Sequence, residues 1–136
     1  MTIWLSQMLI LAIHDVQLAE HGGGTGLRDQ GLLESALARP LNRAGYGEPD
    51  IAELGALYAI AIARNHPFVD GNKRTAWAAL VTFLDLNGAV FEPGEVEAAT
   101  TMLRLAAGDV SDDEFIAWVR GHAVPGPTGG VSNEPA

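Results

Sequence analysis

The residues best suited to chemistry lie close together near the middle of the chain. His66 carries an imidazole that can take up a proton near neutral pH. Asp70 offers carboxylate oxygens of the kind that a hard cation such as Mg²⁺ prefers. Lys73 and Arg74 follow directly and add two positive charges. A proton acceptor beside a cationic cluster is the combination that transfer of a phosphate-containing group requires.

The two cations stand at an unfavourable place for an ordinary helix. The apolar run from Asn72 to about Leu86 predicts a buried helix that begins just before Lys73. A helix N-terminus carries partial positive charge and therefore favours acidic side chains. We interpret Lys73 and Arg74 as half of an anion site, because exposed backbone N–H groups and cationic side chains together bind phosphate.

Each residue of this segment also has a structural interpretation, and the sequence leaves both open. His66, taken alone, can hydrogen-bond a backbone carbonyl, and Asp70 can N-cap the helix that follows. Asn72 can bind a phosphate oxygen or hold the turn, while Gly71 permits positive φ or close approach of the backbone. Arg64 can belong to the cationic cluster or interact with the end of its own helix.

Composition indicates one compact domain. The chain has 136 residues, of which 48% are apolar and 18% charged. Its net charge of −9 argues against direct DNA binding, since phosphate contacts need a spread basic surface. The apolar stretch 3–13 is shorter than the roughly 20 residues of a membrane span and has no preceding Lys or Arg. We therefore expect a cytoplasmic protein with no membrane segment and an amphipathic first helix.

Patterning predicts an all-α bundle of five or six helices around a central hairpin, with little or no sheet. The expected elements are a first helix from Ser6 to His21, a short helix from Asp29 that stops before Pro40, helices at 52–64, 72–86, 94–107 and 111–120, and an extended segment at 89–91. Residues 40–50 hold two prolines and two glycines and are expected to form a loop. The sequence leaves open whether this loop docks a target, and its length and Tyr46 make it the candidate. The domain is expected to cover 1–120, followed by a disordered tail at 121–136.

The segment His-Pro-Phe-Val-Asp-Gly-Asn-Lys-Arg at 66–74 resembles the signature H-x-F-x-[DE]-G-N of the Fic/Doc (Fido) family. Its Asn-Lys-Arg-Thr ending resembles the Doc ("death on curing") branch. The Fic branch reads H-P-F-x-[DE]-G-N-G-R-x-x-R, so Lys73 stands where that pattern has its second Gly and Trp77 where it has its last Arg. Residues 26–29 and 31–36 are similar to the segment that Doc-type members carry before their second helix. The resemblance spans roughly residues 5–120.

The resemblance implies a Fido fold and a toxin of a toxin–antitoxin pair. Such a toxin transfers the terminal phosphoryl group of ATP to a threonine hydroxyl of translation elongation factor Tu and so arrests translation. By resemblance, His66 is the general base and Asp70 positions Mg²⁺ or supports the base. The residues expected to hold the ATP phosphates are Arg64, Gly71, Asn72, Lys73 and Arg74, with the helix N-terminus as a further donor.

Two alternatives remain open at this point. One is a Fic-like transferase of AMP, and the other is a catalytically silent module that only binds an antitoxin. Lys73 fills space that a glycine would leave for a diphosphate. Trp77 stands where the Fic pattern has an arginine, so that positive charge is missing. Both differences favour phosphoryl transfer over AMP transfer. The family's inhibitory motif [ST]-x-x-x-E-[GN] is absent from the sequence. The resemblance therefore implies restraint in trans by a Phd-type antitoxin.

Overall fold

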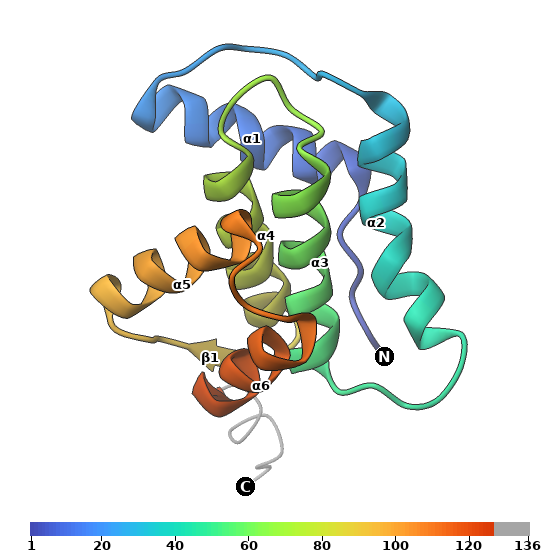
Figure 1. Ribbon diagram of the computed structural model, residues 1–136. Helices are drawn as coiled ribbons and strands as arrows, with labels where there is room; N and C mark the ends of the chain where they lie inside the picture. The colour runs from blue at the N-terminus through green and yellow to red at the C-terminus, as the bar shows by residue number, and fades with distance from the viewer. Residues whose placement is uncertain (127–136) are drawn as a thin grey trace, which may run out of the picture.

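The computed structural model describes residues 1–126, and most of these residues are helical (Figure 1). The helices are α1 (Gln7–His21), α2 (Gln30–Ala44), α3 (Ile51–Asn65), α4 (Asn72–Leu86), α5 (Glu95–Ala107) and α6 (Asp112–His122). A two-stranded antiparallel sheet pairs β1 (Ala89–Phe91) with β2 (Ala123–Pro125). The all-α prediction is thus confirmed. Within residues 1–126, no helix combines the length and the apolar character needed to cross a bilayer.

The antiparallel hairpin of α3 and α4 forms the centre of the bundle (Figure 1). Every residue of α3 from Leu54 to Ala63 is buried, because α2, α4, α5 and α6 all contact this helix. Gly55 lets α4 approach closely, since a Cβ at this position would lie only 3.1 Å from Leu80. A hairpin packed this tightly fixes the position of the loop that joins its two helices.

The predicted helix starts carry the expected caps. Each side chain at the N-cap accepts a hydrogen bond from a backbone N–H three residues later, at Ser6, Asp29, Asp50 and Ser111. Ser111 and Glu114 form the reciprocal bonds of a capping box. At the other end of α4, Gly88 has φ +85° and supplies a left-handed turn after the helix.

The predicted stop before Pro40 is wrong. α2 continues through Pro40 to Ala44, so only residues 45–50 form the connection to α3. A proline inside a helix removes a donor and costs about 3 kcal/mol, but Pro40 is buried in the bundle. The last turn of α2 is also tied down, because Arg43 donates to Glu53 at 2.7 Å. Tertiary packing thus overrides the local proline signal, and the loop proposed to dock a target shrinks to a short turn carrying the exposed Tyr46.

The predicted disordered tail begins too early. α6 continues through Gly121 to His122, and β2 follows it directly. The strand is held by pairing with β1, and the backbone N–H of Gly126 donates to the carbonyl of Gly88 at 2.7 Å. This partner lies far away in sequence, so local composition did not reveal it. Residues 127–136 of the predicted tail lie outside the described part of the chain.

Asp50 links α3 to α6, because its carboxylate accepts from Arg120 at 2.7 Å as well as from the backbone of Glu53. The Arg120 hydrogen bond is the main reason why the pKa of Asp50 lies below its ordinary value of 3.8. Asp50→Asn keeps a capping oxygen and removes the charge. We expect it to lower the free energy of unfolding at pH 7 by about 0.5 kcal/mol, because exposed ion pairs are weak.

The depressed pKa sets the sign of the pH dependence. The ionic contribution of Asp50 is complete above its unfolded-state pKa and is lost as the pH falls through the lower folded-state value. Urea unfolding of the wild type and Asp50→Asn should therefore differ at pH 7 and converge in acid. Glu48→Gln, a change at an exposed neighbour, is the control. A difference that persists unchanged in acid would show that the charge is not responsible.

Candidate active site

The chemically promising residues lie in the loop between α3 and α4 and in the first turn of α4. α3 ends at Asn65 and is followed by its C-cap His66, whose φ of +51° makes it the one non-glycine residue of the described chain with positive φ. Pro67 follows and prevents helix continuation. Gly71, with φ +77°, starts α4. The chain thus turns sharply between two buried helices at the end of the bundle where the α1–α2 connection also passes (Figure 1).

A cavity of about 380 Å³ lies over this turn and is hereafter called the motif pocket. Its lining residues are Ala63, His66, Val69, Asp70, Gly71, Asn72, Lys73, Arg74 and Ala106. The fold therefore brings six of the seven predicted site residues to one pocket. The side chains of His66, Lys73 and Arg74 are exposed there and accessible to a ligand.

The N-terminus of α4 has no side-chain cap from any residue of the described chain. The first backbone hydrogen bond into the helix is donated by Thr75 to the carbonyl of Gly71 at 2.9 Å. The preceding N–H groups therefore point out of the helix start together with the side chains of Lys73 and Arg74. This arrangement suits an anion, because dipole and cations reinforce each other.

Asp70 does not N-cap α4, contrary to one of its two predicted roles. Its Oδ1 accepts from the backbone N–H of Gly71 at 2.8 Å, and its Oδ2 accepts from Gly24 at 3.2 Å. These two bonds, Gly71 first, hold the pKa of Asp70 below its ordinary value, so the exposed carboxylate is ionised at neutral pH. The carboxylate is tied to the α1–α2 connection and leaves the start of α4 free for a ligand.

Asp70 is suited to be a single protein ligand of Mg²⁺. Among residues 1–126, no group of three or more His, Cys, Asp or Glu side chains could enclose a metal ion. Mg²⁺ in nucleotide sites is commonly bound by one or two carboxylates, water and the substrate's phosphates. One ionised and exposed carboxylate beside a phosphate site fits that pattern.

Asn72 holds the turn. Its Oδ1 accepts from the backbone N–H of Phe68 at 2.9 Å, and its Nδ2 donates to the Phe68 carbonyl at 2.9 Å. Phe68 itself is buried in the core. Both the oxygen and the nitrogen of the Asn72 side-chain amide are thus hydrogen-bonded to the backbone of Phe68. This leaves the backbone N–H of Asn72 as the group that could bind an anion.

Arg64 is directed elsewhere. Its guanidinium pairs with Asp112 and donates to the carbonyl of Val110 at 2.9 Å, at the start of α6. His66 lies one residue beyond the end of α3 and has a left-handed backbone, so its side chain does not continue the helical face that carries Arg64. Within the described chain, the lining of the motif pocket does not include Arg64. Because Arg64 is close in sequence to Lys73 and Arg74, we expected all three in one cationic cluster. The fold instead directs Arg64 away from the other two.

His14 on α1 supports the turn between α3 and α4, a role that the sequence did not reveal. It is buried on α1. Its Nε2 lies 2.8 Å from the carbonyl oxygen of Asp70, which can only accept, so Nε2 carries the hydrogen. The ring stacks on Phe68 with centroids 3.8 Å apart. The contact joins residues 56 positions apart, which no local pattern encodes.

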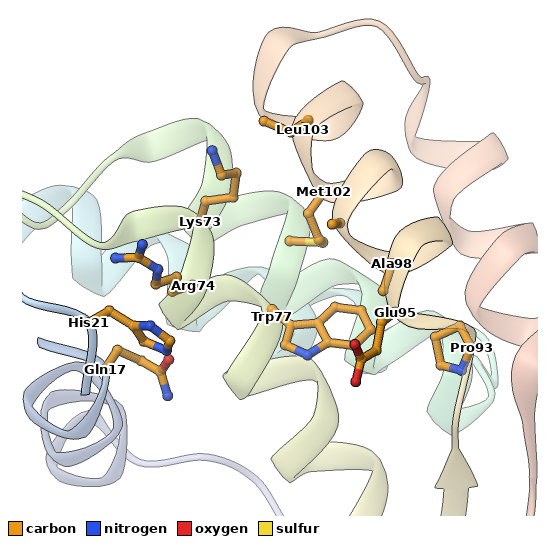
Figure 2. Close-up of a pocket in the computed structure, with 11 residues that line it drawn as sticks. Gln17, His21, Lys73, Arg74, Trp77, Pro93, Glu95, Ala98, Met102 and Leu103 are labelled. Carbon is orange, nitrogen blue, oxygen red and sulfur yellow. The ribbon is translucent and has the colours of Figure 1, made fainter. Parts of the chain in front are cut away.

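A second cavity of about 490 Å³ adjoins the motif pocket between α1, α4 and α5, and we call it the α4–α5 groove (Figure 2). Its lining residues are Gln17, His21, Lys73, Arg74, Trp77, Pro93, Glu95, Ala98, Ala99, Met102 and Leu103. Lys73 and Arg74 border both cavities. Trp77 is half-buried, and its indole forms part of the groove wall. The ring centroids of Trp77 and Phe91 lie 5.4 Å apart.

Gly23 is required for the position of Asp70. A Cβ at Gly23 would lie 2.8 Å from Asp70 Oδ2, and its φ is +125°. We expect Gly23→Ala to displace the carboxylate from the N–H of Gly24 and so to raise the pKa of Asp70, because that bond favours the ionised form. A carboxyl ¹³C NMR titration measures this value.

Gly22→Ala is the matched control for that substitution. Gly22 also has positive φ, at +79°, but a Cβ there would meet no atom of the described chain within 4 Å. The control shares the backbone strain and lacks the contact with Asp70. The same Asp70 pKa in both variants would contradict the proposed contact.

The sequence itself is similar to known proteins over this whole region. A profile of the Fic/DOC family matches residues 4–84. The chain is 40% identical over 113 residues to Toxin Doc of Mycolicibacterium smegmatis, covering 79% of this chain and 86% of the relative. It is 38% identical over 104 residues to Protein kinase doc of Escherichia phage P1, covering 75% of this chain and 81% of the relative. The matched region includes both helices of the central hairpin and the loop between them, and the chain belongs to the Fic/DOC family.

Proposed function

We propose that this protein is a Doc-type toxin that acts as an ATP-dependent protein kinase. Its proposed substrate is a threonine hydroxyl of translation elongation factor Tu, and the proposed consequence is arrest of translation in the cytoplasm. The names of the two relatives support the class of activity. The observation that carries the proposal is one pocket that joins the exposed His66 imidazole to the uncapped start of α4 with Lys73 and Arg74.

The proposed reaction is an in-line phosphoryl transfer. His66 accepts the proton of the threonine hydroxyl, whose oxygen forms a bond to the γ-phosphorus of ATP. The bond from the γ-phosphorus to the oxygen that bridges it to the β-phosphorus breaks, and ADP leaves. Lys73, Arg74 and the N–H groups at the start of α4 stabilise the negative charge that spreads over the transferred group. Catalysis in this proposal therefore comes mainly from positioning the hydroxyl and ATP and from stabilising the negative charge of the transferred group.

Asp70 would hold Mg²⁺ in this proposal. The ion would supply positive charge that neutralises the phosphate oxygens. Asn72 keeps the turn in shape through Phe68 and offers its N–H, and Gly71 permits the left-handed turn before the helix. Arg64 does not bind the phosphates in this proposal, because its guanidinium already donates hydrogen bonds to Asp112 and to the carbonyl of Val110.

Two residues favour phosphoryl transfer over AMP transfer. Lys73 borders both the motif pocket and the α4–α5 groove, so its side chain occupies space that a glycine would leave open. Trp77 packs on Phe91 and Trp118 and offers no cation where the Fic pattern has its last arginine. An AMP-transferring pose would lose a charge partner and gain a steric obstacle at these positions.

We further propose that an antitoxin segment of the Phd type binds the α4–α5 groove in trans. The groove is apolar along Trp77, Met102 and Leu103, while Lys73 and Arg74 lie at one end (Figure 2). An amphipathic helix with an acidic side chain at one end matches this distribution of apolar and positive groups. A helix bound there would also cover the two cations needed for the ATP phosphates, which explains inhibition without a conformational change.

The central test is a mass shift. The purified protein is incubated with ATP, Mg²⁺ and elongation factor Tu, and the factor is then measured by intact-mass spectrometry. We expect a gain of one phosphoryl group, and His66→Ala should lower the rate by at least about 100-fold because the proton acceptor is lost. The exposed His66 side chain makes few packing contacts, so the variant should unfold at the same urea concentration as the wild type.

Other outcomes of this experiment select other functions. A gain of AMP would replace the kinase proposal by the Fic-like activity. An unmodified factor together with growth arrest that survives His66→Ala would support the silent antitoxin-binding module. An unmodified factor together with growth arrest that His66→Ala relieves would retain an enzyme and exclude the proposed target.

The groove proposal makes a separate prediction. Leu103→Asp places a carboxylate at the apolar wall, and we expect it to weaken antitoxin binding at least about 10-fold in calorimetry, because an apolar contact is lost and a charge is desolvated. Leu103 is already 56% exposed, so folding should tolerate the change. Val96→Asp is the control on the same helix, because Val96 is 81% exposed and is not part of the groove lining. Equal affinities of both variants would exclude the groove as the binding surface.

A further inference from the structure

Arg28 binds the end of α3 at the position where the site begins. Its Nε donates to the carbonyl of His66 at 2.7 Å, and its Nη2 donates to the carbonyl of Asn65 at 2.9 Å. Its backbone N–H donates to the carbonyl of Pro67 at 2.7 Å, which also accepts from Asp29 at 3.0 Å. Three consecutive carbonyls around the general base are therefore bound by one residue and its neighbour in the α1–α2 connection.

These bonds stabilise a backbone conformation that is costly by itself. His66 has φ +51°, and the left-handed conformation is strained at a residue with a Cβ because the Cβ lies too close to the following carbonyl oxygen. The last carbonyls of a helix lack partners within the helix, and they favour a nearby cation. The guanidinium of Arg28 provides partners for the carbonyls at the end of α3 and holds the left-handed backbone of His66 in place. Its hydrogen bonds are charge-assisted and therefore strong.

We propose that Arg28 is a positioning residue for His66. By holding the carbonyls of Asn65 and His66, its side chain fixes the rotation of the His66 backbone and hence the direction of the imidazole. Arg28 itself is exposed and does not belong to the lining of the motif pocket in the described chain, so it acts through the backbone. This inference rests on the proposed function, in which the imidazole must meet an incoming hydroxyl.

The other contacts of the α1–α2 connection allow the side chain to be tested alone. The backbone N–H of Val69 donates to Gly26 at 3.0 Å, and Leu27 pairs with Phe68 in an isolated β-bridge. Both contacts, like the bonds from the backbone of Arg28 to Pro67, are made by the main chain. Arg28→Ala keeps all of them and removes the two guanidinium bonds.

The kinetic test compares Arg28→Ala with Arg104→Ala. Arg104 is also exposed and also donates to a backbone carbonyl beyond the end of its helix, that of Asp109 at 3.1 Å. We expect kcat of Arg28→Ala to fall about 10- to 100-fold, since small misplacements of a reacting group have such effects. KM for ATP should change less than about 2-fold, and millimolar guanidinium chloride should restore part of kcat. Arg104→Ala should show none of these effects.

A second variant and a spectroscopic measurement complete the test. Arg28→Lys keeps the charge without the rigid fork that spans two carbonyls, so its kcat should lie between those of the wild type and Arg28→Ala. The ¹H–¹³C signals of the His66 ring should shift in both Arg28 variants and stay unchanged in Arg104→Ala. This NMR comparison needs no transfer activity, so it decides on the positioning role even if the wild type proves not to be a kinase.

Three results would overturn the positioning role. One is unchanged His66 ring signals in Arg28→Ala and Arg28→Lys. Another is a loss of kcat no larger than that of Arg104→Ala. The third is an effect confined to KM for ATP, which would place Arg28 in nucleotide binding. If Arg28→Ala fails to fold, Arg28→Lys decides, and wild-type kcat with unchanged ring signals in that variant would contradict the proposal.

Discussion

The open N-terminus of α4 is the feature on which the site depends. A helix start normally recruits an acidic or hydroxyl side chain, and Asp70 stands at the right place in sequence to provide one. Its carboxylate is instead bound by the N–H groups of Gly71 and Gly24, so the helix start stays positive and accessible. Lys73 and Arg74 then add to a field that an ordinary cap would have weakened. In a chain with a net charge of −9, this is a local reversal of sign that suits an anion.

The rest of the fold fixes the position of the α4 N-terminus relative to the imidazole of His66. α3 is buried along most of its length, and Gly55 brings α4 into close contact with it, so the two helices cannot shift independently. The short loop between them contains a left-handed residue, His66, that the surroundings must hold in place. α1 contributes the buried ring of His14 below Asp70, and the α1–α2 connection contributes Arg28 beside His66. The active conformation is thus supported from two sides by segments far away in sequence.

Under the proposed function, the two adjoining cavities connect phosphoryl transfer with inhibition by an antitoxin. Lys73 and Arg74 border the polar motif pocket and the apolar α4–α5 groove alike. A ligand in either cavity therefore competes for the same two cations. Under the proposed function, such competition lets a partner inhibit the toxin by occupying the groove, and the partner need not contact His66.

The sequence alone determined the features that local chemistry controls. The helix caps, the end of α4 at Gly88, the buried hairpin and the grouping of His66 with Lys73 and Arg74 all follow from neighbouring residues and periodic patterns. Tertiary structure alone decided which way Arg64 and Asp70 turn, because their partners Asp112 and Gly24 come from other elements. It also decided that α2 passes through Pro40 and that β2 pairs with β1, since packing and strand pairing outweigh local propensity there. The bonds of His14 and Arg28 belong to the same class: each joins segments dozens of residues apart, and such contacts exist only once the chain has folded.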